Sequence, residues 1–419
     1  MEIIFLNKIK INRKLNASSL INALFVCIIV SVFCGCLVLF AHYQNLLNDR
    51  LTIQEELINI NDSSFNYLIS NAEVFPPGQM QQLDIFEEGI PTYMKKMKWG
   101  FYDVLICKTV FKNDTISKIA LVGQKNKYDN PLALYVTNYD KPLKLSGKTT
   151  IKGQIKIPTG LTEQAYINGK MGNTITLTGE KLKSERKFPK IVNGIDLSTY
   201  ENTSGNTIGT DTLIVNGFDQ ETKIIDISST TTVTNVSIKG NIILVSKNEL
   251  EISETAHLED VLVVAPIIHL KSGFKGNIQM VSSRKIILED WVLLKYPSSI
   301  YMKNDIDSLS VSIGQNSTFV GGIVLDGDTS EGTIYRTLTI KDKAKVIGDV
   351  YCYGRTQLNG EVIGSLYTDK FFLKTESSTY ENVILNGTIN RDSLPQNFVG
   401  LQLFSNVLDK KEYAIIKEL

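Results

Sequence analysis

Histidine is scarce in this sequence, which argues against metal-dependent chemistry. The 419 residues include only three histidines, His42, His257 and His269. The last two lie twelve positions apart in strand-rich sequence, whereas a helical zinc pair needs histidines on one helix face. The sequence therefore predicts no metal ion and no cofactor.

Two common catalytic signatures are also missing. No Gly-x-Ser-x-Gly motif occurs, so no hydrolase nucleophile can be assigned from the sequence. Gly147-Lys148-Thr149-Thr150 resembles the end of a phosphate-binding loop, but Pro142 stands where that loop needs its first glycine. A glycine turn between strands is the simpler interpretation.

Net charge is absent as well. Lysine plus arginine number 44, and so do aspartate plus glutamate. A chain without excess positive charge is not expected to bind nucleic acid. Of the five cysteines, three lie inside an apolar segment, and Cys107 and Cys352 are far apart. Cysteine usage therefore gives no information about a disulfide framework.

Charge is missing locally from Leu15 to Asn48, and this absence is informative. Within it, Leu20 to Ala41 is apolar apart from one asparagine and one serine, which is the length of a membrane-spanning helix. The basic residues Lys8, Lys10, Arg13 and Lys14 precede it. They predict a single-pass anchor with a cytoplasmic N-terminus and a periplasmic or extracellular bulk.

Two alternatives compete for the apolar segment. A cleaved secretory signal needs a shorter apolar core followed by small residues, and none are well placed. A lipoprotein could use Cys36, but the chain stays apolar through residues 37–40, where a lipidated N-terminus should turn polar.

After the apolar segment, apolar residues recur with helical spacing as far as about Asn71, where Phe75-Pro76-Pro77-Gly78 breaks the pattern. Residues 102–107 and 116–122 then alternate as an antiparallel hairpin would, and Leu132 to Val136 could add a third strand.

Repeated fragments dominate the second half. Lys239-Gly240-Asn241 returns as Lys275-Gly276-Asn277, and Val346-Ile347-Gly348 returns as Val362-Ile363-Gly364. Strands recur about every 16 to 20 residues without helical patterning between them, which is typical of stacked β-coils. The sequence predicts a mainly β chain ending in a right-handed parallel β-helix, or β-solenoid. Its expected corners, where φ > 0 is needed, are Gly240, Asn241, Gly276, Asn277, Gly348 and Gly364.

The predicted organisation has four parts. Residues 1–42 form the basic leader and membrane helix, and 43–140 an extended helix with a small antiparallel sheet. Residues 141–235 are a strand-rich region leading into a β-solenoid at 236–419, which the segment Lys410 to Leu419 would cap.

Acidic residues suggest a rival, enzymatic function. Leu258-Glu259-Asp260 and Leu288-Glu289-Asp290 repeat a motif that could place acids on one face. Enzymes that cut polysaccharides need such carboxylates in pairs or beside bases. The alternative is that acids at coil corners keep the stack soluble.

The segment Lys14 to Asn22 resembles a type IV prepilin leader. In that family a short basic leader is cut before the apolar helix. The resemblance implies that Ala17 precedes the cut, that Ser18 becomes the N-terminus, and that Asn22 occupies the place of an acid that pairs with a neighbouring subunit. Two positions depart from the family pattern: Ala17 replaces the usual glycine, and Asn22 replaces glutamate.

The C-terminal half looks like a right-handed β-helix, and residues 346–373 are similar in texture to bactofilins, which form polymers. That resemblance implies a structural, self-associating protein. We therefore predict a membrane-anchored, exported structural or adhesive protein, a minor or tip subunit of a type IV pilus or related filament. Its predicted partners are the membrane, other pilin-like subunits or itself, and a surface glycan. The alternative is a polysaccharide-binding or -degrading enzyme.

Overall fold

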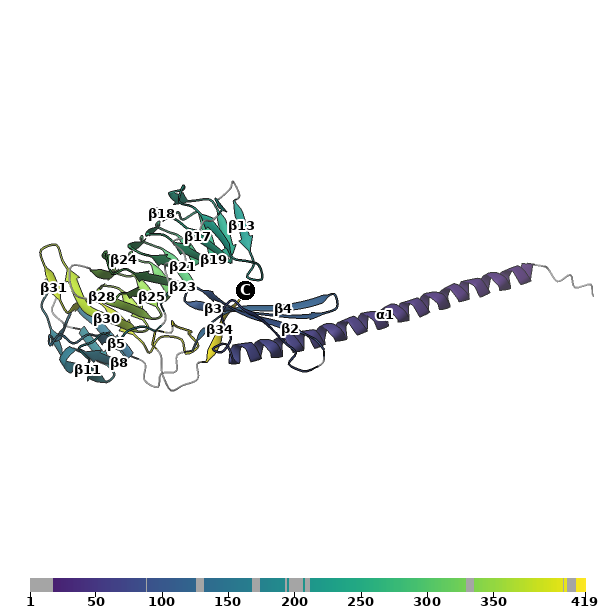
Figure 1. The fold of residues 1–419 in the computed structure, drawn as a ribbon, viewed down its shortest axis with the longest axis horizontal. Helices are drawn as coiled ribbons and strands as arrows, with labels where there is room; N and C mark the ends of the chain where they lie inside the picture. Colours follow the sequence, from purple (N-terminus) through teal and green to yellow (C-terminus); the bar gives the residue numbers. More distant parts are fainter. Residues whose placement is uncertain are drawn as a thin grey trace, which may run out of the picture.

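The structure is mainly β, with one long α-helix among the residues it describes. The computed structural model describes residues 18–87, 89–125, 132–167, 174–192, 194–195, 206–207, 212–328, 335–401, 403–404 and 412–419. Figure 1 shows a projecting helix, a small antiparallel sheet beside its last turns, and a large stack of strands. The predicted N-terminal helix and the β-rich remainder are confirmed.

Helix α1 (Ser18–Ser70) runs without interruption for 53 residues. Its apolar N-terminal stretch is entirely unburied, and its length and composition would allow it to cross a membrane. The helix ends shortly before Pro76-Pro77-Gly78, as predicted, because proline cannot continue the helical hydrogen-bond ladder.

The small sheet, called the collar sheet below, is antiparallel. Its strands, in spatial order, are β1 (Met80–Leu83), β2 (Thr92–Trp99), β3 (Tyr102–Phe111), β4 (Asp114–Gln124) and β34 (Tyr413–Glu418). The predicted hairpin is confirmed as β3 and β4. The expected cap at the C-terminus is not found, because β34 joins the collar sheet beside β4 instead of covering the stack.

Alternating side chains give the collar sheet two apolar faces. Leu105 and Cys107 of β3 pack with Phe65 and Leu68 of α1. Val104, next to Leu105 in the same strand, belongs to a cluster shared with the stack. Successive strand residues point to opposite faces, so this one strand holds the helix on one side and the stack on the other.

The large sheet, called the stack below, contains 26 of the described strands. They are β5 (Leu132–Val136), β7 (Lys148–Lys152), β8 (Gln154–Ile157), β10 (Thr174–Thr178), β11 (Lys181–Lys183), β12 (Asn206–Thr207), β13 (Leu213–Asn216), β14 (Lys223–Asp226), β15 (Thr232–Val233), β16 (Ser237–Gly240), β17 (Ile242–Val245), β18 (Glu249–Ile252), β19 (His257–Val264), β20 (Ile267–Leu270), β21 (Lys275–Ser282), β22 (Lys285–Leu288), β23 (Leu293–Lys303), β24 (Leu309–Ile313), β25 (Thr318–Asp326), β26 (Arg336–Ile340), β27 (Lys345–Ile347), β28 (Val350–Leu358), β29 (Glu361–Ile363), β30 (Leu366–Lys374), β31 (Thr379–Glu381) and β33 (Thr388–Asn390). A separate parallel sheet contains β6 (Leu143–Ser146), β9 (Thr162–Gln164) and β32 (Val383–Leu385).

The register of the stack piles aliphatic side chains into columns. Ile268 pairs with Ile286, Ile286 with Val311, and Val311 with Leu338, all in parallel strands. All four side chains are buried in one continuous apolar cluster. Each layer therefore buries its apolar side chains against the next, and burial of this kind is the main stabilising contribution to such a fold.

The order of layers differs from the order of the chain. β5, β6 and β7 pair with β30, β32 and β33, so the layers that contain β5 to β11 lie beyond those near residue 390. β13 lies at the opposite end, as Figure 1 shows. The described strands of the region 141–235 are thus divided between the two ends of the stack. Leu132 to Val136 belongs to the stack and not to the collar hairpin.

The predicted corner residues fall into two groups. Gly240, Gly348 and Gly364 have φ of +94°, +133° and +145°, in the region that favours glycine. The remaining three, Gly276, Asn241 and Asn277, do not have left-handed backbone.

A glutamine from the stack holds the tip of the β2–β3 hairpin. Gln279 donates from Nε2 to the Trp99 carbonyl at 2.8 Å and accepts from the Phe101 N–H at 3.0 Å. Gly100 lies between them with φ +60°, and a Cβ there would stand 2.1 Å from the Gln279 Oε1. This contact fixes the collar sheet against the stack.

We expect Gln279→Ala to lower the free energy of unfolding by about 2–3 kcal/mol, because it leaves the buried Trp99 carbonyl and the partly buried Phe101 N–H without their partner. Chemical denaturation of the detergent-solubilised chain would measure the loss. Gln164→Ala, at an exposed position of β9, is the matched control and should change stability by less than about 0.5 kcal/mol. Equal effects of the two substitutions would contradict the assigned role of Gln279.

Candidate functional site: a mixed-charge hollow on the stack

A hollow of about 550 Å³ lies on the outer face of the stack. We call it the Asp326 hollow. It is lined by Lys190, Ile191, Gly194, Ile195, Tyr301, Lys303, Asp326, Gly327 and Asp328. Its volume is within the range usual for small-molecule sites.

The register of two strands places the polar residues of the hollow. Tyr301 and Lys303 end β23, and Asp326 ends β25, which pairs with β23 so that Lys303 lies beside Asp326. Alternate residues of a strand share a face. Tyr301 belongs to the cluster outside the aliphatic core, so Lys303 and Asp326 project on this same outer face from adjacent layers.

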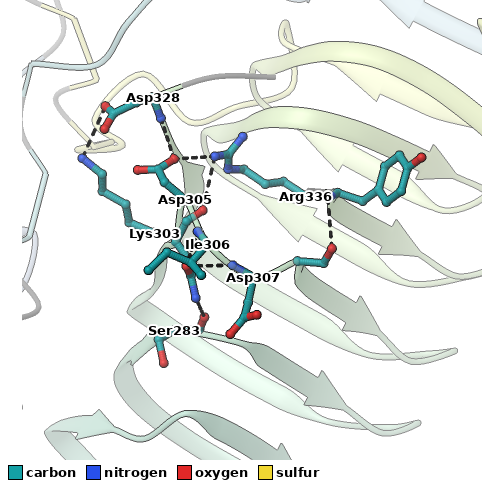
Figure 2. Close-up of polar contacts among 10 residues, drawn as sticks. Ser283, Lys303, Asp305, Ile306, Asp307, Asp328 and Arg336 are labelled. Carbon is teal, nitrogen blue, oxygen red and sulfur yellow. Dashed lines mark hydrogen bonds and ion pairs between the residues drawn. The ribbon is translucent and has the colours of Figure 1, made fainter. Parts of the chain in front are cut away.

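An ion pair holds one edge of the hollow in position, and Figure 2 shows its contacts. Arg336 Nη2 donates to Asp305 Oδ1 at 2.6 Å and to the Asn304 carbonyl at 3.2 Å. The same Asp305 oxygen accepts the backbone N–H of Asp328 at 2.8 Å. A Cβ on Gly327 would lie 1.8 Å from Arg336 Nη2, so only glycine fits above the guanidinium. Charge-assisted hydrogen bonds of this kind hold the Asp328 backbone in place.

The carboxylates around the hollow ionise differently. Burial raises the pKa of Asp326, and the nearby Asp328 charge adds to this, while the Gly327 N–H and Lys303 oppose it. Burial also opposes ionisation of Asp305, but the Asp328 N–H and the Arg336 charge together lower the pKa of Asp305. Lys303 Nζ lies 3.7 Å from Asp328 Oδ1.

The hollow therefore offers hydrogen-bond acceptors beside donors. Asp326 and Asp328 carry acceptor oxygens, whereas Lys303 and Lys190 carry donor groups. The two lysines and the two aspartates have formal charges that cancel. The site therefore suits a ligand that both donates and accepts hydrogen bonds and has little net charge.

Glu259 and Asp260, the first predicted acid pair, lie where the collar sheet contacts the stack. Lys417 of β34 contacts Glu259 Oε1 at 2.8 Å and Asp260 Oδ2 at 2.7 Å. Lys239 lies 3.2 Å from Glu259, and Asn277 donates to Asp260. Hydrogen bonding to Lys417 lowers the pKa of Glu259 more than burial raises it. These acids fasten the last strand to the stack.

The second predicted acid pair lies elsewhere on the stack surface. Glu289 Oε1 is 2.7 Å from His269 Nε2, and Asp290 Oδ1 accepts the Gln315 N–H at 2.8 Å. Glu259 and Asp260 contact different partners from Glu289 and Asp290, so the repeated motif has two separate structural settings. Among the described residues no group of three potential metal ligands occurs.

The residues of the prepilin-like segment lie at the start of α1. Ser18 is the first residue of the helix, and Asn22 is exposed in its opening turns. Ala17 lies outside the described residues.

Sequence reasoning did not find Lys303, Asp326 or Asp328. A signal was present, because two apolar strand ends run into charged residues, Tyr301-Met302-Lys303 and Val324-Leu325-Asp326. Each pattern alone resembles an ordinary strand end followed by a turn. Only the pairing of β23 with β25 brings them together.

The chain matches no known protein family, no curated protein and no solved structure.

Proposed function

We propose that this chain is a membrane-anchored, exported structural or adhesive protein, and more specifically a pilin-like minor or tip subunit that carries a β-solenoid. In this proposal α1 crosses the membrane once, the N-terminus is cytoplasmic, and the collar sheet and stack are periplasmic or extracellular.

The observation that carries the proposal is the way the stack is connected. β4 ends at Gln124, β34 begins at Tyr413, and these two residues are paired neighbours in the collar sheet. The whole stack is therefore an insertion between two adjacent strands. Without it, the chain is an apolar helix packed on a small antiparallel sheet, which is the order expected from the prepilin-like segment.

The helix surface between the apolar segment and the collar sheet supports assembly. Tyr43, Leu47 and Leu51 follow one another at intervals of four residues and are largely exposed, so they share one helix face. An exposed apolar helix stripe is stabilised when another helix packs on it. Other pilin-like subunits, or further copies of this chain, would supply such helices.

The stack is suited to presenting a surface at a distance from the membrane. Parallel strands in register, with one shared aliphatic core, support a β-solenoid in which each layer is stabilised by its neighbours. Such a column is long and stiff, and it would hold its outer face away from the membrane surface.

N-terminal sequencing of the protein recovered from carbonate-washed membranes tests the proposal. We expect the mature chain to begin at Ser18 and to stay in the membrane pellet, because α1 would remain as an anchor after cleavage. Ala17→Leu should retain Met1, since a large residue before the cut would block processing, and should stay in the pellet too. An intact Met1 on the parent chain would rule out the pilin-like assignment, and release by carbonate would rule out the anchor.

A further inference from the structure

The Asp326 hollow has no part in anchoring or in helix packing. It lies on the stack, away from α1, and its wall combines residues of β23 and β25 with Lys190, Ile191, Gly194 and Ile195. The aliphatic core holds the layers together, and its packing does not explain why the outer face of the stack carries a concave, polar site.

The charged side chains that line the hollow limit the kinds of ligand that it can bind. Phosphate is bound chiefly by cationic and N–H donors and is repelled by carboxylates, and calcium is bound by six to eight oxygen ligands and is repelled by ammonium groups. The hollow has two lysines and two aspartates, and Lys303 lies beside both Asp326 and Asp328. Both ions are therefore disfavoured.

We propose that the Asp326 hollow binds a neutral, hydroxyl-rich ligand, namely a sugar residue of an extracellular glycan. A sugar hydroxyl donates one hydrogen bond and accepts others, which matches carboxylates placed beside an ammonium group. Asp326 and Asp328 accept from sugar hydroxyls, and Lys303 donates to them.

Two features of the hollow bear on how such a ligand would bind. The Asp305–Arg336 pair holds the Asp328 backbone before any ligand arrives, which reduces the ordering required on binding. Sugar hydroxyls also favour the ionised form of Asp326, whose pKa is raised by burial. Affinity should therefore rise as the pH rises through the Asp326 pKa and fall below it.

The full-length chain in detergent micelles should be titrated with the methyl glycosides of glucose, galactose and N-acetylglucosamine, and separately with inorganic phosphate and calcium. We expect one or more of the glycosides to bind, even if with a Kd of only about 1 mM. Asp328→Ala should weaken this binding at least about tenfold, which corresponds to 1.4 kcal/mol.

Asp307→Ala is the matched control, because this exposed carboxylate lies close by in Figure 2 but does not line the hollow. It should bind like the parent chain. Lys303→Gln removes the ammonium group that donates to the sugar hydroxyls and leaves Asp328 unchanged. It should also weaken binding. The proposal is overturned if no glycoside binds at about 10 mM, if both Asp328→Ala and Lys303→Gln bind as the parent does, or if phosphate or calcium saturates the hollow. None of these outcomes affects the anchoring proposal, which rests on α1 and the collar sheet.

Discussion

Gly348→Ala is expected to abolish folding of the stack. The Cβ of an alanine at this position would stand 1.9 Å from the Gly321 carbonyl oxygen of the adjacent layer, and the backbone φ is +133°. Gly364 repeats the arrangement, with its Cβ position 1.9 Å from the Gly348 oxygen. Backbone from one layer lies directly on backbone from the next, so neither side can move away without breaking strand pairing. We expect a loss above about 4 kcal/mol, in the exceptional range for a point substitution.

Gly273→Ala separates the clash from the effect of backbone conformation. Gly273 also has positive φ, +84°, but the nearest atom to an added Cβ would be the Glu254 Cβ at 3.8 Å. Alanine there should lower the free energy of unfolding by only about 1 kcal/mol, from backbone strain alone. Denaturant titrations and the yield of folded protein compare the two variants. Similar losses would show that close layer contact at Gly348 is unimportant.

The same region shows what a sequence pattern can and cannot predict. Val346-Ile347 and Val362-Ile363 occupy paired positions in adjacent strands, so the sixteen-residue spacing reflects one real layer. The other repeated fragment has no such meaning. Lys239 pairs with Glu259, and Glu259 pairs with Asn277, so Lys239 is equivalent to Asn277 and not to Lys275. Short polar triplets recur by chance, whereas apolar triplets fill the shared core.

The helix and the β-rich character followed from local patterns, because apolar spacing and charge-free length act within a few turns or strands. The order of layers could not be predicted. Leu366 pairs with Leu134, and Ile415 pairs with Val122, across more than two hundred residues of chain. Nothing local in residues 132–136 distinguishes a third collar strand from a layer of the stack, since both are short apolar strands.

The candidate site was beyond prediction for a related reason. A buried ion pair and its neighbours come from separate turns, and their meeting depends on layer register. Asp305 and Arg336 are thirty-one residues apart, and each is unremarkable in its own segment. The acids that did repeat in sequence, Glu259 and Asp260, instead fasten β34 to the stack.

Asp305→Ala is expected to be the second strongly destabilising substitution. The Arg336 side chain is 1 % exposed and its ion-pair partner Asp305 is 33 % exposed. Removing the carboxylate takes away the ion-pair partner of a buried guanidinium, which typically lowers the free energy of unfolding by about 3 kcal/mol. It also removes the acceptor of the Asp328 N–H. Asp307→Ala, an exposed change two residues away, should have an effect below about 0.5 kcal/mol.

A double variant and a pH series test the cause. Asp305→Leu combined with Arg336→Met removes both charges, and it should recover most of the stability lost in Asp305→Ala, because no buried charge is left uncompensated. The pKa of Asp305 is lowered from its ordinary value of 3.8, so its contribution is fully present above that value and is lost as the pH falls through the lower folded-state pKa. The difference between the parent chain and Asp305→Ala should therefore stay constant above about pH 5 and shrink in stronger acid. Two results would show that the carboxylate acts through packing and not through its charge. One is a stability difference between the parent chain and Asp305→Ala that grows as the pH falls. The other is a double variant that is no more stable than Asp305→Ala.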